Sequence, residues 1–538
     1  MTQSKAFRYS WPLAGFLFAV VSAPHALGNG PDVIKASHHD VSHPLSRMAI
    51  GPTSKNAGSD GQSITARPTG AMISNAHADP VAAPFAGPLS GVSLISNFDG
   101  QSAQDNRNLF GFAFVPPDTN GAVGANQFVQ MVNVTIAVYD KSTGALQLGP
   151  AAIHTLWQGF GGLCEFGGGT PDFADGGDPV VLYDHLAGRW IVTQLQYNTT
   201  FTQNAQCIAV STTSDATGSY NRYEYDFGAS FPDYPKFSVW PDAYYNTINV
   251  FPGNKFAGPQ ACAFDRSAML AGEPASAICF QQPSTISSLL PADLDGRTLP
   301  PAGSPNYLVG LADSTHLNFF RFHVDFSNPA NSSMTGPTLI PVAPYSEICA
   351  RATTVSCIPE PNPGEKVDGL SDRVMFRLAY RNFGDHESLV VNHTIQGGSL
   401  AGVRWYELRN PAAPFVYQQS TLVDPDVNYW LGSVAMDKIG NLALGFSVSS
   451  HNVFPSIYVA ARAPGDPAGS LSGPLVLVNG SGVQLNSFRR WGDYSSMSVD
   501  PVDDCTFWYT NEYYANTGII NWATRISAFK FNSCKGRN

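Results

Sequence analysis

The sequence is poor in charged residues. They make up only 13% of its 538 positions, and acidic residues exceed basic ones to give a formal net charge of −11. So little Lys, Glu and Arg argues against a helical protein, and the acidic balance argues against binding nucleic acid, whose phosphates require a basic face. The chain is rich instead in turn formers and aromatics, with 50 Gly, 40 Pro and 12% aromatic residues. This composition suits many short strands joined by tight turns.

Long apolar runs are also missing. The run from Trp11 to Ala23 is too short for a bilayer span, follows the basic residues Lys5 and Arg8, and is followed by small residues. We interpret residues 1–28 as a signal peptide and expect a monomeric protein that is secreted or periplasmic, with no membrane span. Residues 29–90 are rich in Ala, Ser, Gly and Pro without an apolar period, which predicts a disordered linker or pro-segment before a folded domain at 91–538.

The CxxC spacing of zinc and redox sites is absent from the eight cysteines. An even number of cysteines in an exported chain predicts disulfides, and 105 pairings are possible. Pairing of sequence neighbours is favoured because it staples adjacent segments. The favoured pairs are Cys164–Cys207, Cys262–Cys279, Cys349–Cys357 and Cys505–Cys534.

A strand–turn–strand pattern recurs along the chain. It is clearest in RWGDYSSMSVDPVDDCTFWYT (490–510), and related stretches are DGGDPVVLYDHLAGRWIVTQ (175–194), FPDYPKFSVWPDAYYNTINV (231–250) and YWLGSVAMDKIGNLALGFSV (429–448). Repeats of short strands at intervals of roughly 50–70 residues are typical of radial or stacked architectures. The sequence therefore predicts an all-β protein, a seven-bladed β-propeller.

One weakly patterned unit leaves other architectures open. The fourth unit, residues 306–326, is weakly patterned, so six or eight blades are alternatives, and a pair of two-sheet sandwiches is a further one.

The segments 281–303 and 348–365 carry Pro, Gly and Ser without a period. We expect both to be long loops between strands, where binding sites are often found.

Aligning the units shows two recurring Asp positions. One lies in the turn after the first strand of a unit, where the side chain can hydrogen-bond the turn backbone, and we expect it to be structural. Its members are Asp140, Asp184, Asp437 and Asp500.

The other Asp position lies at the entrance to the first strand of each unit. Because the first strands of a propeller line its central channel, these carboxylates are expected to converge at one mouth, where like charges raise one another's pKa. The members are Asp118, Asp178, Asp233, Asp372 and Asp493, with Gly432 in the sixth unit. The alternative interpretation is that each Asp caps the backbone amides of its own strand.

Aromatic and basic residues flank these entrances. Flat rings at a channel mouth are suitable platforms for sugars, and an Arg can hold a carboxylate with two hydrogen bonds. The candidate substrate-binding residues are Trp430, Trp491, Tyr234, Tyr494, Arg373 and Arg490. The alternatives are core packing for the rings and neutralisation of the adjacent Asp for the arginines.

Familiar catalytic motifs are absent: the sequence contains no GxSxG, HExxH or phosphate-binding loop. We expect no cofactor. The acidic stretches DFADGGD (172–178) and DPDVN (424–428) supply oxygen ligands that suit calcium, but neither matches the twelve-residue EF-hand loop.

The chain resembles uncharacterised secreted bacterial β-propeller proteins. The resemblance extends over about residues 91–534 and rests on PPDTNGAVG, GDPVVLYD, FPDYPKFSVWPD, RNFGDHESLVVNHT and RWGDYSSMSVDPVDDCTFWYTNEY. It implies a propeller and brings no catalytic residues with it. The chain is more loosely similar to sialidase-like propellers, but the S-x-D-x-G-x-T-W box of that superfamily is absent, which argues against sialidase chemistry.

Three functional hypotheses follow. The first is a glycoside hydrolase in which two of Asp178, Asp233, Asp372 and Asp493 act as acid and as base or nucleophile. The second is a non-catalytic extracellular propeller that binds a glycan or a protein. The third is a polysaccharide lyase, which would need a His, Tyr or Arg base near the channel. The histidines His185, His386 and His393 do not occupy entrance positions, which disfavours the lyase.

Overall fold

The structure is a computed structural model that describes residues 30–48, 77–166, 175–253, 255–349, 356–362, 364–485 and 489–535. The predicted signal peptide, residues 1–28, lies outside the described residues. So do residues 49–76 of the predicted linker.

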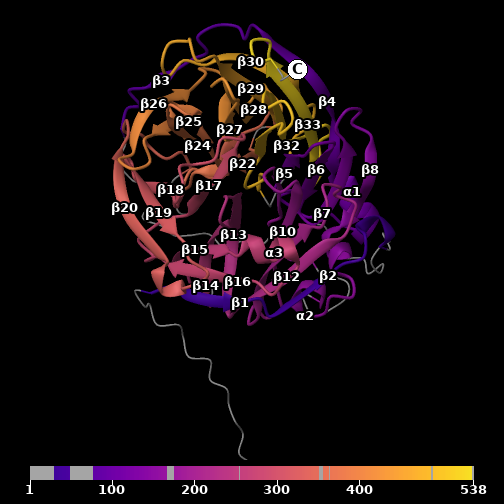
Figure 1. Ribbon diagram of the computed structural model, residues 1–538. Helices are drawn as coiled ribbons and strands as arrows, with labels where there is room; N and C mark the ends of the chain where they lie inside the picture. Colours follow the sequence, from indigo (N-terminus) through magenta and orange to yellow (C-terminus); the bar gives the residue numbers. More distant parts are fainter. Residues whose placement is uncertain are drawn as a thin grey trace, which may run out of the picture.

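The protein is nearly all β, and its antiparallel sheets are arranged around a common centre (Figure 1). The first two sheets of this arrangement come from consecutive stretches of chain. One contains β5 (Asn120–Val123), β6 (Gln127–Val132), β7 (Thr135–Asp140) and β8 (Leu146–Ala152). The next contains β9 (Val180–Asp184), β10 (Arg189–Tyr197), β11 (Asn204–Ser211) and β12 (Tyr220–Gly228).

The middle of the chain continues the pattern. The strands β13 (Ser230–Val239), β14 (Tyr244–Pro252), β15 (Gly258–Phe264) and β16 (Ser276–Gln281) form one sheet. They are followed by β17 (Leu289–Asp295), β18 (Asn306–Asp313), β19 (His316–His323) and β20 (Ser333–Pro341), and then by β23 (Met375–Asn382), β24 (Glu387–Gly397), β25 (Leu400–Arg409) and β26 (Phe415–Leu422). Because β17 and β23 pair in parallel, these last two sets form one continuous sheet.

The last sheets close the circle. One contains β27 (Asn428–Met436), β28 (Leu442–Ser449), β29 (Ser456–Arg462) and β30 (Ser472–Val478). The other combines β31 (Ser496–Val499), β32 (Thr506–Tyr513) and β33 (Ala523–Phe531) with β4 (Val92–Ser102), which pairs antiparallel with β33. The first strands of neighbouring sheets contact one another in sequence order, and β31 contacts β5. This closed ring of inner strands is the arrangement of a β-propeller.

The remaining elements are short. They are the hairpin β21 (Ser356–Pro359) and β22 (Lys366–Asp368), the helices α1 (Ala103–Phe110), α2 (Gly162–Phe166) and α3 (Arg266–Ala271), and the 3-10 turns η1 (Leu45–Arg47), η2 (Ile153–Trp157) and η4 (Pro329–Asn331).

The turn aspartates have the structural role that their spacing predicts. Oδ1 of Asp184 accepts hydrogen bonds from the amides of Leu186 and Ala187 at 3.0 and 3.1 Å, and Gly188 follows with a φ of +65°. The turns at Asp140, Asp437 and Asp500 are bonded in the same way. A short acceptor side chain followed by a left-handed glycine fixes the turns at Asp140, Asp184 and Asp437, and Asp504, with a φ of +57°, takes the place of the glycine after Asp500.

The predicted disulfide pairing is confirmed. Cys164–Cys207 joins α2 to β11, and Cys262–Cys279 joins directly opposed residues of β15 and β16. Cys349–Cys357 and Cys505–Cys534 are also formed. All eight cysteines are therefore paired with sequence neighbours.

The predicted linker is wrong for its described parts. The strand β1 (Asp32–Lys35) pairs with β16, β2 (His38–Val41) pairs with β12, and β3 (Ala82–Ala83) pairs with β26. These strands are largely exposed, so apolar burial stabilises them little. They are held mainly by hydrogen bonds to backbone groups that the edge strands would otherwise leave unpaired. Apolar content alone does not predict this kind of order.

The two expected long loops are also corrected. Residues 281–303 contain β17, the inner strand of the weakly patterned fourth unit, and residues 348–365 contain β21. In β17 the sequence LLPADLD places a Pro and two Asp in a fully buried strand, which hides the apolar pattern of a first strand.

Candidate functional site

The entrances of the inner strands meet at the centre of the molecule, where a group of charged and aromatic residues is gathered. We call this group the entrance cluster. It comprises Asp118, Asp178, Asp233, Tyr234, Lys236, Asp372, Arg373, Arg490, Asp493 and Tyr494. The five predicted aspartates all belong to it, together with Lys236, which the sequence analysis did not identify.

Hydrogen bonds join the entrance of one strand to that of the next. The amide of Asp493 donates to Oδ1 of Asp118 at 2.7 Å, and the amide of Tyr234 donates to Oδ2 of Asp178 at 3.1 Å. Between them, Asn133 donates to Oδ2 of Asp118 and accepts from the amide of Asp178, both at 2.9 Å. These two carboxylates therefore bind backbone groups of neighbouring entrances, not amides of their own strands.

The backbone at these entrances is unusual. The φ angles of Asp118, Asp178 and Tyr234 are +47°, +48° and +58°, in the left-handed region that non-glycine residues seldom adopt. Such residues persist where surrounding contacts hold them, and they cluster at functional sites. In β13 the register shifts between Asp233 and Lys236, so this bulge aims both side chains differently from a regular strand.

Burial dominates the electrostatics of the cluster. It raises the pKa of Asp118 and of Asp233 well above the usual value, and like charges raise both further: Asp493 and Asp178 act on Asp118, and Asp178 acts on Asp233. Burial likewise lowers the pKa of Lys236 to about 8, against the opposing pull of the surrounding carboxylates. The cluster therefore holds acids that favour the protonated form beside a lysine that loses its proton easily.

Asp233 differs from its neighbours in one respect. Among the residues that the structure describes, no hydrogen bond reaches its carboxyl group, although Arg373 and Lys236 act on it electrostatically. Asp118 and Asp178 each accept backbone hydrogen bonds, and Asp493 is ion-paired with Arg490. Asp233 thus has a raised pKa and a carboxyl group that is not committed to holding the fold.

The two predicted arginines are both engaged with acids. Arg373 donates to both carboxylate oxygens of Asp372 at 2.9 and 3.0 Å and lies 4.5 Å from the ring centre of Tyr234. Arg490 bridges Asp493 and Asp368. The side chain of Asp372 is 40% exposed, so this edge of the cluster meets solvent.

The predicted aromatic platforms do not face a channel mouth. Trp430 and Trp491 are fully buried, with ring centres 5.5 Å apart, and they pack with Tyr514. Tyr234 and Tyr494 enclose Lys236, whose Nζ lies 3.6 and 3.9 Å from their ring centres. The sequence interpretation of Trp430 and Trp491 as sugar platforms is corrected to core packing, because a hydrophobic core draws in the largest rings.

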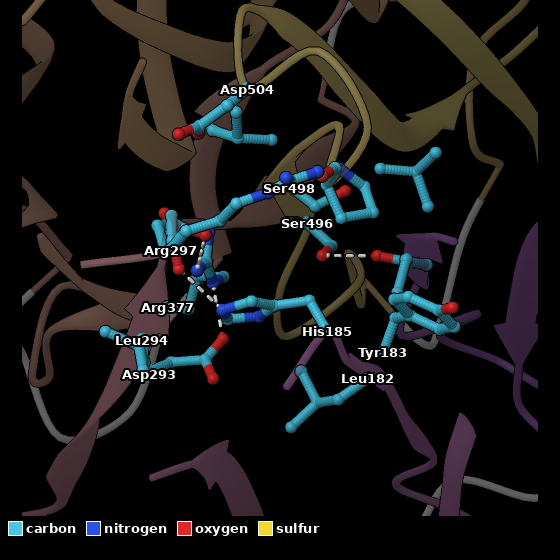
Figure 2. A pocket seen from close by; sticks show the side chains of 17 residues that line it. Leu182, Tyr183, His185, Asp293, Leu294, Arg297, Arg377, Ser496, Ser498 and Asp504 are labelled. Carbon is cyan, nitrogen blue, oxygen red and sulfur yellow. Dashed lines mark hydrogen bonds and ion pairs between the residues drawn. The ribbon is translucent and has the colours of Figure 1, made fainter. Parts of the chain in front are cut away.

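A second polar site lies at the other end of the inner strands, where they run into their turns. We call it the distal pocket. Its polar lining includes His185, Asp293, Asp295, Arg297, Arg377 and Asp504. Arg377 joins Asp293 and Asp295 at 2.7 and 2.6 Å, and Figure 2 shows its side chain close to those of Asp293 and His185.

The distal pocket was not predicted from the sequence. The sequence indicates the pocket through charged residues inside otherwise apolar first strands. These are Asp293 and Asp295 in PADLD and Arg377 in MFRLAY. A charged residue at an inward position of an inner strand must meet a partner across the channel, since an unpaired buried charge is unstable. Because β17 was not predicted as a strand, its two aspartates were not recognised as inward-facing charges.

The structure describes the second acidic stretch in full and the first from Asp175. Within its described ranges, no group of three or more His, Cys, Asp or Glu is arranged to hold a metal ion, and Asp172 of DFADGGD lies outside them. In DPDVN, Oδ1 of Asp424 accepts from the amides of Asp426 and Val427, as in a turn. No helix of the described chain is long and apolar enough to cross a membrane.

Comparison with known proteins gives a remote likeness in structure alone. No protein family model and no curated protein sequence matches the chain. Among solved structures, an α-L-arabinanase from Penicillium chrysogenum in complex with arabinobiose is 8% identical, with a TM-score of 0.36, and the match covers 82% of this chain and all (100%) of that one.

Two further structures match at a similar level. A polysaccharide lyase described as an ulvan lyase of a new family is 12% identical at a TM-score of 0.36, covering 79% of this chain and 96% of that one. The N-terminal domain of Nup159 is 8% identical at a TM-score of 0.35, covering 84% and 100%. At these values the comparisons assign no activity.

Proposed function

We propose that this protein is a secreted, carbohydrate-active propeller that hydrolyses glycosidic bonds at the entrance cluster. Asp233 acts as the general acid, and Asp493 acts as the base or nucleophile. The observation that carries the proposal is the environment of Asp233, a buried carboxyl group with a raised pKa and no structural hydrogen bond among the described residues. A general acid must hold its proton near neutral pH, and burial among like charges supplies this property.

Asp493 suits the complementary role. It is ion-paired with Arg490, its side chain is 15% exposed, and it acts electrostatically on Asp233. In the proposed step Asp233 protonates the leaving oxygen of the glycosidic bond while the carboxylate of Asp493 attacks the sugar carbon or takes a proton from an attacking water. A substrate would approach along the exposed edge at Asp372, where Arg373 holds the carboxylate in place.

The first test is a screen of polysaccharides for release of reducing ends, followed by kinetics of Asp233→Asn and Asp493→Asn. Both substitutions are nearly isosteric, and each is expected to lower kcat by about 10²–10⁴-fold. Asp385→Asn is the matched control, because that side chain is 83% exposed in the turn after β23. Full activity in both cluster variants would refute the proposal.

A non-catalytic role is the second candidate, and the burial of the cluster favours it. Lys236, Trp430 and Trp491 are inaccessible, and the hydrogen bonds of Asp118 and Asp178 tie strand entrances together. If the centre of the propeller only holds the sheets together, a glycan or a protein would bind through the loops. It would retain ligands on a glycan array without releasing any product.

A lyase is the third candidate. Lys236, with its pKa lowered to about 8, is a base at the cluster that the sequence analysis did not consider. Lyase action would produce unsaturated sugars that absorb ultraviolet light, whereas hydrolysis would not. The product therefore distinguishes these two reactions on any substrate that the screen identifies.

We also propose that the propeller has seven blades. Supporting this count, the parallel pairing of β17 with β23 is a contact between two inner strands, so the nine-stranded sheet divides into two blades at that point. The strand β4 then completes the last blade beside β33. A crystal structure would test the count directly.

A further inference from the structure

The distal pocket contains polar groups that hydrolysis at the entrance cluster does not use. Asp118, Asp178 and Asp493 precede their inner strands, whereas His185, Arg297 and Pro501 follow theirs, so the two sites lie at opposite ends. The turns after β9, β17 and β31 each contribute to the pocket. A set of polar groups that converges from three sheets on one cavity is typical of a ligand site.

Asp295 is the strongest indication of a ligand. Its side chain is 10% exposed, and Oδ1 accepts from Arg377 at 2.6 Å. Its other oxygen, Oδ2, is buried and has no hydrogen-bond partner among the described residues. An unsatisfied buried carboxylate oxygen destabilises a fold, so a hydrogen-bond donor from a ligand would stabilise this site.

Two further groups present acceptors. Nε2 of His185 lies 2.6 Å from the carbonyl oxygen of Gly296 and donates to it, so Nδ1 of the neutral imidazole is an acceptor. The hydroxyl of Ser498, also in the pocket lining, has no hydrogen-bond partner in the described part of the chain. The interior of the pocket therefore favours a ligand that offers several hydroxyl donors.

The mouth of the distal pocket offers a hydrogen-bond donor, whereas its interior offers acceptors. Arg297 is exposed, and among the residues that the structure describes its guanidinium makes one hydrogen bond, to the carbonyl oxygen of Pro501 at 3.3 Å. The other charges are paired internally, Arg377 with Asp293 and Asp295, and Asp504 with Arg381. Arg297 thus remains available to an oxygen acceptor, while the rest of the lining keeps one acidic group in excess, because Arg377 alone faces two aspartates.

We propose that the distal pocket is a second carbohydrate-binding site, which holds the end of a saccharide. Neighbouring hydroxyls donate to Asp295 and to Nδ1 of His185, and Arg297 donates to a ring oxygen or a carboxylate of the same sugar. The cavity measures about 40 Å³, so only the end of a ligand enters. This site does not depend on hydrolysis at the entrance cluster.

Ligand-observed saturation-transfer NMR and calorimetry on the full chain test the proposal. The probes are methyl glucoside, glucuronic acid and tetrahydropyran, the last of which has the ring without hydroxyls. We expect saturable binding of at least one of the two sugars and none of tetrahydropyran. Arg297→Ala should weaken binding about tenfold, the effect of losing one charge-assisted hydrogen bond. Ser498→Ala should weaken it severalfold, and Lys255→Ala, an exposed cation in the β14–β15 loop, should have no effect.

The outcomes separate the two proposals. Weakening of glucuronic acid alone by Arg297→Ala identifies an acidic saccharide, and weakening of both sugars identifies a contact to a ring oxygen; either supports the site. Binding of neither sugar, or unchanged affinity in both pocket variants, overturns it. Because Asp233→Asn leaves the distal pocket intact, loss of hydrolysis in that variant with retained sugar binding bears on the entrance cluster alone.

Discussion

At the residue scale, the side-chain amide of Asn133 joins two strand entrances at the centre of the molecule. Asn133 is 8% exposed and joins the entrances of β5 and β9 by donating to Asp118 and to the carbonyl oxygen of Pro116 and accepting from the amide of Asp178. Its amide is therefore a bridge between two sheets. It also holds a carboxylate, that of Asp118, whose pKa is raised by burial and by Asp493.

Replacing Asn133 tests this bridge. Asn133→Ala leaves a buried carboxylate oxygen and a buried amide without their partner, so we expect a loss of about 3 kcal/mol in the free energy of unfolding. Urea denaturation followed by tryptophan fluorescence measures it. Asn362→Ala, at an exposed position, is the control and should change stability little.

The raised pKa of Asp233 predicts a pH dependence of stability. Its pKa is higher in the folded protein than in the unfolded chain, so the folded protein binds more protons between those two values. Stability from this group is therefore greatest below the unfolded pKa and falls as pH rises through the folded one. Asp233→Asn removes this dependence, and the variant should gain stability relative to the wild type as the pH rises above the usual pKa of an aspartic acid, about 4.

Denaturation at several pH values provides the measurement. Asp385→Asn serves as the comparison, because its exposed carboxylate cannot produce the same effect. A parallel loss of stability in wild type and Asp233→Asn as pH rises would show that Asp233 ionises normally.

At the scale of elements, the edges of the outer strands are where the chain adds its N-terminal segment. Arg222 of β12 donates to both oxygens of Asp40 in β2, and the amide of Ala36 donates to the carbonyl oxygen of Ala275 beside β16. The segment thus covers the edges of two sheets. Covered edges do not pair with other molecules, which protects against aggregation.

A truncation tests this role. Removing residues 1–48 should lower the midpoint of thermal unfolding by several degrees and promote aggregation on heating, because β12 and β16 lose their outer partners. Differential scanning fluorimetry with light scattering reports both. A chain that starts at residue 30 retains β1 and β2 and is the control, and identical behaviour of the two chains would contradict the prediction.

The elements also show what the sequence could and could not predict. Turns such as Asp184–Gly188 and the neighbouring cysteine pairs were predicted because they follow local rules, an acceptor side chain before a glycine and short loop closure. The strand β1 was not, because its pairing depends on an edge of β16 more than 240 residues away. The convergence of Asp118, Asp178, Asp233 and Asp493 followed from the repeat, but the hydrogen bonds of Asn133 and the position of Lys236 between two tyrosines required the three-dimensional structure.

At the scale of the whole molecule, the ring is closed by pairing the two ends of the domain, β4 with β33. The disulfide Cys505–Cys534 lies beside this closure and links the turn after β31 to the residues following β33. Circular closure packs the last sheet against the first through β31 and β5, so neither is left with an unpacked face. The stability of the closure is therefore expected to affect every blade.

Opening this disulfide tests the closure. The Cys505→Ser, Cys534→Ser double variant should lose about 3–4 kcal/mol of stability, since the bond closes a loop with a sequence separation of 29. The Cys349→Ser, Cys357→Ser variant, with a separation of 8, should lose about 1 kcal/mol less. Equal stability of the first variant and the wild type in guanidinium denaturation would show that strand pairing alone holds the ring.

The central claim, that Asp233 donates the proton to the leaving group, is tested most directly by comparing two substrates of the Asp233→Asn variant. One is the polysaccharide found by screening, and the other is an aryl glycoside of the same sugar whose leaving group needs no protonation. We predict that kcat falls about 10²–10⁴-fold on the polysaccharide and less than about tenfold on the aryl glycoside. An equal loss on both substrates, or no loss on either, would contradict the assignment of Asp233 as the acid.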